Sequence, residues 1–276
     1  MELENLEFQK KILLASILDT NVNNIFTKNY KITEVQNLEY HHKLKLLESG
    51  YPLDYLLKKI KFLDLEILVT PKTLIPRHET EEWVAELIKK LKVLNLSQTI
   101  YQGLIELSLV VDIGCGSGII GLSLAKYFEN AILTDVSKEA IVTAIENAKV
   151  NEIKNAIFLE SDLLDSNDLR SSIEKYDSWI LVSNLPYLPA SDDSFISKSK
   201  VRFEPQKALY SGENGLDLFK KLLIQINELK IKPSVVYFEL DPRNIREAES
   251  LLCRIYSKIE VIIDQNNLER VLIGTI

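Results

Sequence analysis

The feature that most constrains the fold is a short apolar run that leads into three closely spaced glycines. Residues 107–113 are rich in Leu, Val and Ile, which is typical of a parallel strand covered on both faces. Gly114, Gly116 and Gly118 follow, and they let the backbone turn tightly and approach a bound molecule because they carry no Cβ. An apolar helix begins next, and its first N–H groups face the same space. A strand, a glycine loop and a helix therefore predict a ligand-binding turn.

Two aspartates narrow the choice of ligand. Asp135 ends the next apolar strand, 131–135, where an acidic residue can bind ribose hydroxyls. The loop has the spacing G-x-G-x-G, whereas dinucleotide-binding loops have G-x-G-x-x-G. Asp112 precedes the loop and can accept hydrogen bonds from loop amides and from a ligand ammonium. These features favour S-adenosylmethionine over NAD; taken alone, the loop also fits an ordinary strand-to-helix turn.

Strands and helices alternate after the glycine loop, which predicts an α/β fold with a parallel sheet covered by helices on both faces. The expected strands are 107–113, 131–135, 156–159, 176–183 and 234–240, followed by a final pair at 259–263 and 271–276. Ligands bind beyond the carboxyl ends of such strands. Asp162 follows the third strand and could receive an adenine amino group, with Leu163 against the ring, although a solvated loop aspartate is equally consistent with the sequence.

The sequence Asn184-Leu185-Pro186-Tyr187 follows the fourth predicted strand and indicates the chemistry. A planar amide nitrogen is a poor nucleophile because its lone pair is delocalised, and accepting hydrogen bonds from both of its N–H groups would orient it. Asn184 offers a side-chain carbonyl. Leu185 offers a main-chain carbonyl, held because Pro186 restricts the residue before it. Tyr187 offers an aromatic wall, so we predict Asn184 and Tyr187 as catalytic; the alternative is a strand-ending Asn-x-Pro turn.

The rest of the chain predicts two further parts. Residues 1–60 read as a small helical domain, in which Thr33 and Gln36 have the spacing of a capping box. Residues 61–78 read as a β-hairpin linker, with one strand at 61–69 and a second at 74–76. The remaining domain, 79–276, begins with a helix. Arg77 lies just before that helix and could hold a carboxylate.

Composition restricts partners and compartment. The net charge of −7 weighs against nucleic acid as a direct partner. Two cysteines are too few for a disulfide framework, and the acidic N-terminus does not resemble a signal peptide. No apolar run approaches the length of a membrane span. We expect a cytoplasmic monomer without a membrane partner. We expect no metal site, since the adjacent His41 and His42 face different directions on a helix.

Several segments together resemble the bacterial release factor glutamine methyltransferases. Residues 74–81 are similar to that family's L-I-P-R-P-[ED]-T-E segment, with His78 in place of a proline, and residues 112–118 match its D-[IL]-G-[CT]-G-[ST]-G loop. Residues 184–187 stand where the family has N-P-P-Y. Residues 201–217 and 264–271 resemble its V-R-[FY]-E-P…G-x-D-G-L-D stretch and its D-x-x-x-x-x-R-V end. The resemblance covers nearly the whole chain.

The resemblance implies a seven-stranded Rossmann-like class I methyltransferase domain that methylates the Gly-Gly-Gln glutamine of peptide chain release factors. Carried over residue by residue, it assigns S-adenosylmethionine to Gly114, Cys115, Gly116, Ser117, Gly118, Asp135, Leu163 and Asn184. It assigns the glutamine to Asn184, Leu185, Pro186 and Tyr187.

Leu185 departs from the family's proline, and N-L-P-Y also occurs in ribosomal RNA adenine dimethyltransferases. The alternatives are therefore methylation of a ribosomal protein glutamine, adenine N6-methylation of nucleic acid, and a non-catalytic binding module. We also expect the long segment 188–211 to rim the glutamine pocket, anchored by Arg202 and Glu204.

Overall fold

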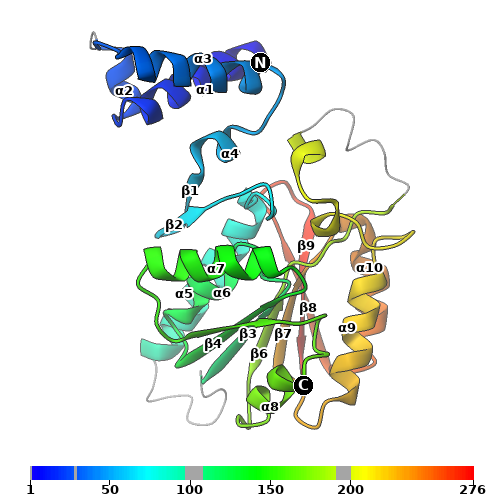
Figure 1. Ribbon diagram of the computed structural model, residues 1–276. Helices are drawn as coiled ribbons and strands as arrows, with labels where there is room; N and C mark the ends of the chain where they lie inside the picture. The colour runs from blue at the N-terminus through cyan, green and yellow to red at the C-terminus, as the bar shows by residue number, and fades with distance from the viewer. Residues whose placement is uncertain (1, 28–29, 97–107, 191–199) are drawn as a thin grey trace.

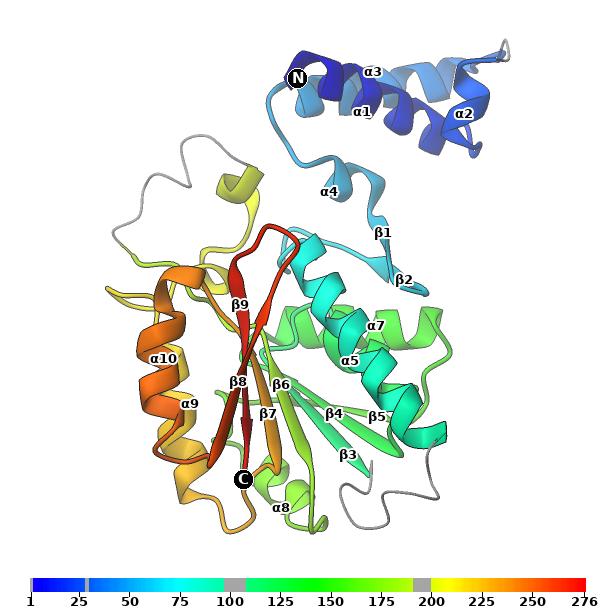
Figure 2. The same ribbon diagram turned by 180° about the vertical axis from the view of Figure 1, so that it is seen from behind.

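The computed structural model describes residues 2–27, 30–96, 108–190 and 200–276, and all structural statements below refer to these residues. The chain forms a group of N-terminal helices, a small β-hairpin, and a larger part built on a central sheet (Figure 1). Figure 2 shows the same arrangement from behind, with helices on both sides of the sheet.

The central sheet has seven strands in the order β5-β4-β3-β6-β7-β9-β8. Their bounds are β3 Leu109–Ile113, β4 Asn130–Asp135, β5 Ala156–Glu160, β6 Ile180–Ser183, β7 Val235–Glu239, β8 Lys258–Ile263 and β9 Glu269–Thr275. Strands β3 to β7 pair in parallel, and β9 runs antiparallel to both of its neighbours. The seven-stranded α/β prediction is confirmed. Strand β6 begins at Ile180, later than the predicted 176, because residues 176–179 form bends and irregular backbone; the sequence analysis also missed a short helix, 167–173, between β5 and β6.

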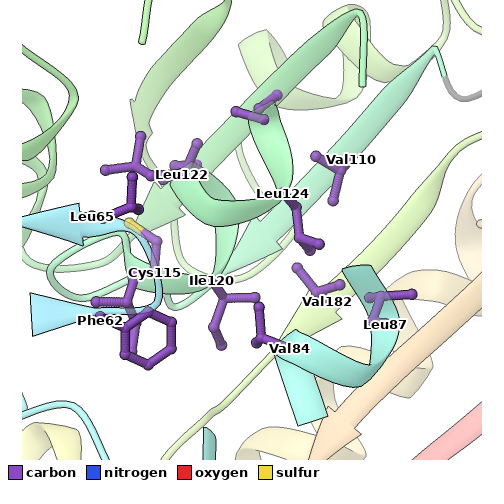
Figure 3. Close-up of a cluster of buried hydrophobic side chains, with 14 of the residues drawn as sticks. Phe62, Leu65, Val84, Leu87, Val110, Cys115, Ile120, Leu122, Leu124 and Val182 are labelled. Atoms are coloured by element: carbon purple, nitrogen blue, oxygen red, sulfur yellow. The ribbon is translucent and has the colours of Figure 1, made fainter. Parts of the chain in front are cut away.

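Helices cover the two faces of the sheet. One layer holds α5 His78–Leu96, α6 Ile119–Ala125 and α7 Lys138–Val150; the other holds α8 Asn167–Ile173, α9 Asp217–Glu228 and α10 Ile245–Leu252. Side chains alternate between the layers along a strand, as the period of two requires. Val110 packs in the first cluster with Val84 of α5 and Leu122 of α6 (Figure 3), and Val111 packs in the second. Both faces are thus buried, which explains the unbroken apolar run in β3.

The N-terminal helices are α1 Glu2–Ile17, α2 Val22–Ile25, α3 Glu34–Glu48 and α4 Leu53–Leu57. The predicted capping box is present at α3, where Thr33 accepts from the Gln36 N–H and Gln36 accepts from the Thr33 N–H. A separate small core of Leu13, Leu47, Leu53 and Leu56 holds these helices together. In the part of the chain described, no helix is long and apolar enough to cross a membrane.

The β-hairpin differs from its prediction. Its strands are β1 Lys59–Phe62 and β2 Leu65–Leu68, and residues 74–76 form no strand. The turn contains Leu63 at φ 52°. A leucine rarely adopts this left-handed conformation, so the sequence does not predict a turn there. Glu81 of α5 supports this turn by accepting from the Leu63 N–H at 2.7 Å. The reversal is thus stabilised by a long-range contact, which local patterning could not reveal.

Candidate active site

A cavity of about 690 Å³ lies at the carboxyl ends of β3, β4, β5 and β6. Its walls come from the glycine loop (114–117), the start of α7 (135–140), the turn after β5 (160–163) and the corner after β6 (184–186). The segment before α5 (72–77), Thr80 in the first turn of α5 and a 3-10 turn, η2 Gln206–Ala208, complete it. The volume is typical of a small-molecule site. The position agrees with the rule that open parallel sheets bind ligands beyond the carboxyl ends of their strands.

The glycine loop is held by the neighbouring strand. The Gly114 and Cys115 N–H groups both donate to the Thr134 carbonyl at 2.8 Å. Gly116 has φ 55°, and a Cβ built on it would meet no atom within 4 Å, so this turn faces open space. Cys115 is buried and belongs to the first core cluster (Figure 3), and burial raises the pKa of its thiol. The loop is therefore fixed before any ligand arrives.

Asp135 lines the cavity and is anchored through both carboxylate oxygens. Oδ2 accepts from the Gly116 N–H at 2.9 Å, and Oδ1 accepts from the Ser137 N–H at 2.8 Å. Each carboxylate oxygen can accept a second hydrogen bond, so the group retains capacity for ligand hydroxyls. Burial raises the pKa of Asp135, and these backbone donors oppose that shift.

Asp112 lies beneath the loop and is not among the cavity-lining residues, in contrast to its predicted position. Its Oδ2 accepts from the Gly121 N–H at 2.8 Å, while its buried Oδ1 has no hydrogen-bond partner within the described residues. Burial raises the pKa of Asp112 to about 7. A Cβ on Gly121 would stand 2.9 Å from the Asp112 Cβ and 2.6 Å from Leu133 Cγ, so only glycine permits this approach of α6.

The turn after β5 contributes both buried and exposed residues to the cavity wall. Leu163 is buried, has φ 57° and lines the cavity, and the Ser161 hydroxyl donates to its carbonyl at 2.8 Å. Asp162 also lines the cavity, but it is exposed and its carboxylate pairs with Lys221 at 2.5 Å. Its carboxylate is thus already engaged by a cation.

The Asn-Leu-Pro corner lies beside the glycine loop. Strands β3 and β6 pair in parallel, with Ile113 opposite Ser183, so both turns open on the same edge of the sheet. Leu185 is buried, and its Cδ2 lies 2.8 Å from the position that a Cβ on Gly114 would occupy. Asn184 and Pro186 line the cavity with it. The structure therefore brings the two sequence motifs to one cavity.

Besides Asp112, two further predicted residues are not on the cavity wall. Gly118 packs against Leu122 and Ala144 at the base of the loop. Tyr187 is not among the cavity-lining residues, and directly after it Leu188 forms a bridge with Tyr210. Burial raises the pKa of the Tyr187 phenol, and the Glu239 carboxylate adds to the shift. The aromatic wall predicted for Tyr187 stays a prediction.

The prediction that Arg77 holds a carboxylate is confirmed. Arg77 Nη2 donates to Glu204 Oε1 at 2.7 Å and to Oε2 at 2.9 Å, and the Glu204 side chain is fully buried. Burial raises the pKa of Glu204, and Arg77 opposes that shift. Arg202 donates to the Ser49 carbonyl at 2.5 Å. These two contacts anchor the end of the predicted rim next to η2; residues 191–199 of that rim lie outside the described residues.

Several residues on the cavity wall and behind it were missed by the sequence analysis. Thr80, which lines the cavity, accepts from Asn184 Nδ2 at 3.3 Å, and Trp83 Nε1 donates to the buried Glu239 at 2.7 Å. Asn147 is fully buried and joins β2 to the glycine loop. The one available signal was the position of Thr80 within residues 74–81.

The fold and this cavity define a class I methyltransferase, and residues 107–220 match the protein family described as "Methyltransferase domain". The N-terminal domain of human METTL16, solved with S-adenosylhomocysteine, superimposes with a TM-score of 0.51 at 14% identity, covering 88% of this chain and 82% of that one. At that identity the likeness shows the fold alone. The protein is an S-adenosylmethionine-dependent methyltransferase.

More similar relatives give the family. The release factor glutamine methyltransferase of Flavobacterium psychrophilum is 32% identical over 232 residues, covering 83% of this chain and 76% of the relative. That of Bacillus anthracis is 28% identical, covering 96% and 91%. The chain belongs to the release factor glutamine methyltransferase family, and the sequence resemblance is confirmed.

Proposed function

We propose that this protein transfers a methyl group from S-adenosylmethionine to the side-chain amide nitrogen, N5, of the Gly-Gly-Gln glutamine in peptide chain release factors. The observation that carries the proposal is the meeting of the glycine loop and the Asn184 corner at one cavity. The names of the relatives support the substrate.

The cavity fits S-adenosylmethionine. Gly116 leaves open space at the loop, Asp135 retains acceptor capacity for ribose hydroxyls, and buried Leu163 offers an apolar surface to an adenine ring. We further assign Ser117 and the neighbouring loop residues to the cofactor, since they line the same wall. When bound, the cofactor supplies an electrophilic methyl group.

The protein's own contribution is to position the acceptor. The Asn184 side-chain carbonyl and the Leu185 main-chain carbonyl accept from the two N–H groups of the glutamine amide. This fixes the nitrogen and favours the pyramidal geometry that transfer requires. Leu185 keeps this role although the family has proline there, because the acceptor is its main chain. We also assign Tyr187 to the glutamine, as an aromatic wall beside Pro186.

Labelled S-adenosylmethionine should be incubated separately with release factor, ribosomes and RNA. We expect label on the release factor alone, lost when the Gly-Gly-Gln glutamine is replaced. Label on a ribosomal protein or on RNA adenine would support one of the other acceptors, and no label on any of the three would support a non-catalytic binding module.

A further inference from the structure

A buried carboxyl group holds one end of an arginine that lines the cavity. Arg77 Nη2 donates to Glu204 Oε1 at 2.7 Å and to Oε2 at 2.9 Å. The Glu204 side chain is 0% exposed, whereas that of Arg77 is 30% exposed and belongs to the cavity wall. Arg77 Nε and Nη1 form no hydrogen bond with the residues that the structure describes. A guanidinium carries N–H donors on all of its nitrogens, so Arg77 is fixed by Glu204 and keeps donors for a ligand.

The other cations on the cavity wall are not held in this way. Lys72, Lys138 and Lys207 are exposed, and their ammonium groups form no hydrogen bond or ion pair within the described part of the chain. Ordering a long, free side chain on a ligand costs conformational entropy. The contact with Glu204 already restricts Arg77 in this way. Among the described residues of this wall, Arg77 is therefore the cation that is in place before a ligand binds.

Arg77 lies on the part of the wall that remains for the amino-acid end of the cofactor. In the proposed site the adenine and the ribose lie at the ends of β5 and β4, and the sulfur faces the corner after β6. The strand order β5-β4-β3-β6 sets these groups in a row along the edge of the sheet. Thr80, which lines the cavity with Arg77 at the start of α5, accepts from Asn184 Nδ2 at 3.3 Å. The methionine chain of a cofactor whose sulfur faces Asn184 therefore starts beside this part of the wall.

We propose that Arg77, held in place by Glu204, binds the carboxylate in the methionine part of S-adenosylmethionine. The inference rests on the cofactor that the proposed function assigns, and it supplies a partner for the one anionic group of that cofactor. The N–H groups of a guanidinium form a planar fork that matches the two oxygens of a carboxylate. Nη2 stays with Glu204, while Nε and Nη1 offer a second edge to the ligand.

The test compares two ligands that differ by this carboxylate. S-adenosylhomocysteine carries it, whereas the decarboxylated analogue keeps only the adenosine, the sulfur and the ammonium. In calorimetric titration of the wild-type protein, the Kd of the analogue should exceed that of S-adenosylhomocysteine roughly 10- to 100-fold, the effect of losing charge-assisted hydrogen bonds. This comparison needs no variant, and equal Kd values would overturn the proposal by themselves.

Arg77→Lys and Lys207→Met assign the effect to a residue. A lysine ammonium can pair with Glu204 but lacks the second edge that a guanidinium offers. In Arg77→Lys we expect the Kd of S-adenosylhomocysteine to rise roughly 10- to 100-fold, while that of the analogue stays within about threefold of wild type. Lys207→Met removes an exposed, unpaired cation from the same wall and should leave the ratio of the two Kd values unchanged.

The remaining outcomes contradict one proposal or the other. Equal weakening of both ligands in Arg77→Lys would show that Arg77 only supports the wall, and loss of discrimination in Lys207→Met would give the carboxylate to a lysine. Binding of neither ligand by wild type would overturn the cofactor assignment as well. The titrations contain no methyl acceptor. A wild-type protein that discriminates between the two ligands but fails to label release factor would therefore overturn the proposed function and leave the role of Arg77 intact.

Discussion

At the scale of single residues, protonation of Asp112, beneath the glycine loop, makes the stability of the folded protein depend on pH. Its pKa of about 7 in the folded protein lies well above the ordinary value of 3.8, and burial is the main cause. Between these two values the folded state holds a proton that the unfolded state has released. Stability of the ligand-free protein therefore falls as pH rises from about 4 to about 7, and this contribution is constant outside that window.

Asp112→Asn should remove this dependence. Urea unfolding of both proteins at pH 5 and pH 8 measures it: wild type should lose more stability than the variant between the two values. Equal losses would show that Asp112 does not hold its proton. The same variant tests the predicted contact with the ligand ammonium. If that contact forms, Asp112→Asn should bind S-adenosylhomocysteine more weakly than wild type does at pH 8.

A second residue, Thr134, carries a buried hydroxyl without a hydrogen-bond partner in the described part of the chain. Thr134→Val keeps the shape and removes the unsatisfied group, so we expect about 1 kcal/mol of added stability. Thr143→Val is the matched comparison, because it deletes a hydroxyl that donates to the Glu139 carbonyl at 3.0 Å and should destabilise. In equilibrium unfolding, the free energy of unfolding should rise in Thr134→Val and fall in Thr143→Val. A fall in both variants would contradict the account of Thr134.

At the scale of elements, α7 joins the hairpin to the cofactor loop. Asn147 accepts from the Leu68 N–H at 2.6 Å and donates to the Leu68 carbonyl at 3.1 Å and the Ser117 carbonyl at 2.9 Å. Asn151, near the surface, makes the equivalent pair of bonds with Glu66. Asn147 and Asn151 therefore both bind the hairpin to α7, but only Asn147 also contacts the glycine loop.

Asn147→Ala should destabilise the protein by about 2–3 kcal/mol, because it leaves buried backbone groups unpaired. It should also weaken cofactor binding, since Ser117 loses its anchor. Asn151→Ala should cost less than about 1 kcal/mol, because water can replace its bonds, and should leave cofactor affinity unchanged. Calorimetric titration with S-adenosylhomocysteine compares the two; equal affinities in both variants would show that Ser117 needs no such anchor.

At the scale of the whole molecule, the sequence analysis predicted features that depend on neighbouring residues and missed contacts between residues far apart in the chain. The glycine loop, the strand ends at Asp135 and Asn184, and the cap at Thr33 follow from nearby residues, and all lie where expected. The hairpin turn was misplaced because Glu81 supports it from another element. Trp83 and Glu239, 156 residues apart, meet only in the folded chain.

Tyr187 and Asp112 show a different limit. Their spacing in the sequence is that of site residues, and both lie close to the cavity without lining it. Asp112 lies inside β3, beneath the glycine loop, and next to Tyr187 the chain forms a bridge between Leu188 and the distant Tyr210. Motif spacing therefore located the site but could not assign every side chain to its wall.

The central claim is that one cavity serves both the methyl donor and the amide acceptor. A crystal structure with S-adenosylhomocysteine and a Gly-Gly-Gln peptide tests it most directly. We predict the cofactor on Gly116 and Asp135, with its sulfur facing a glutamine nitrogen held between the Asn184 side-chain carbonyl and the Leu185 main-chain carbonyl. A peptide bound away from Asn184, or a sulfur directed away from that corner, would contradict the claim.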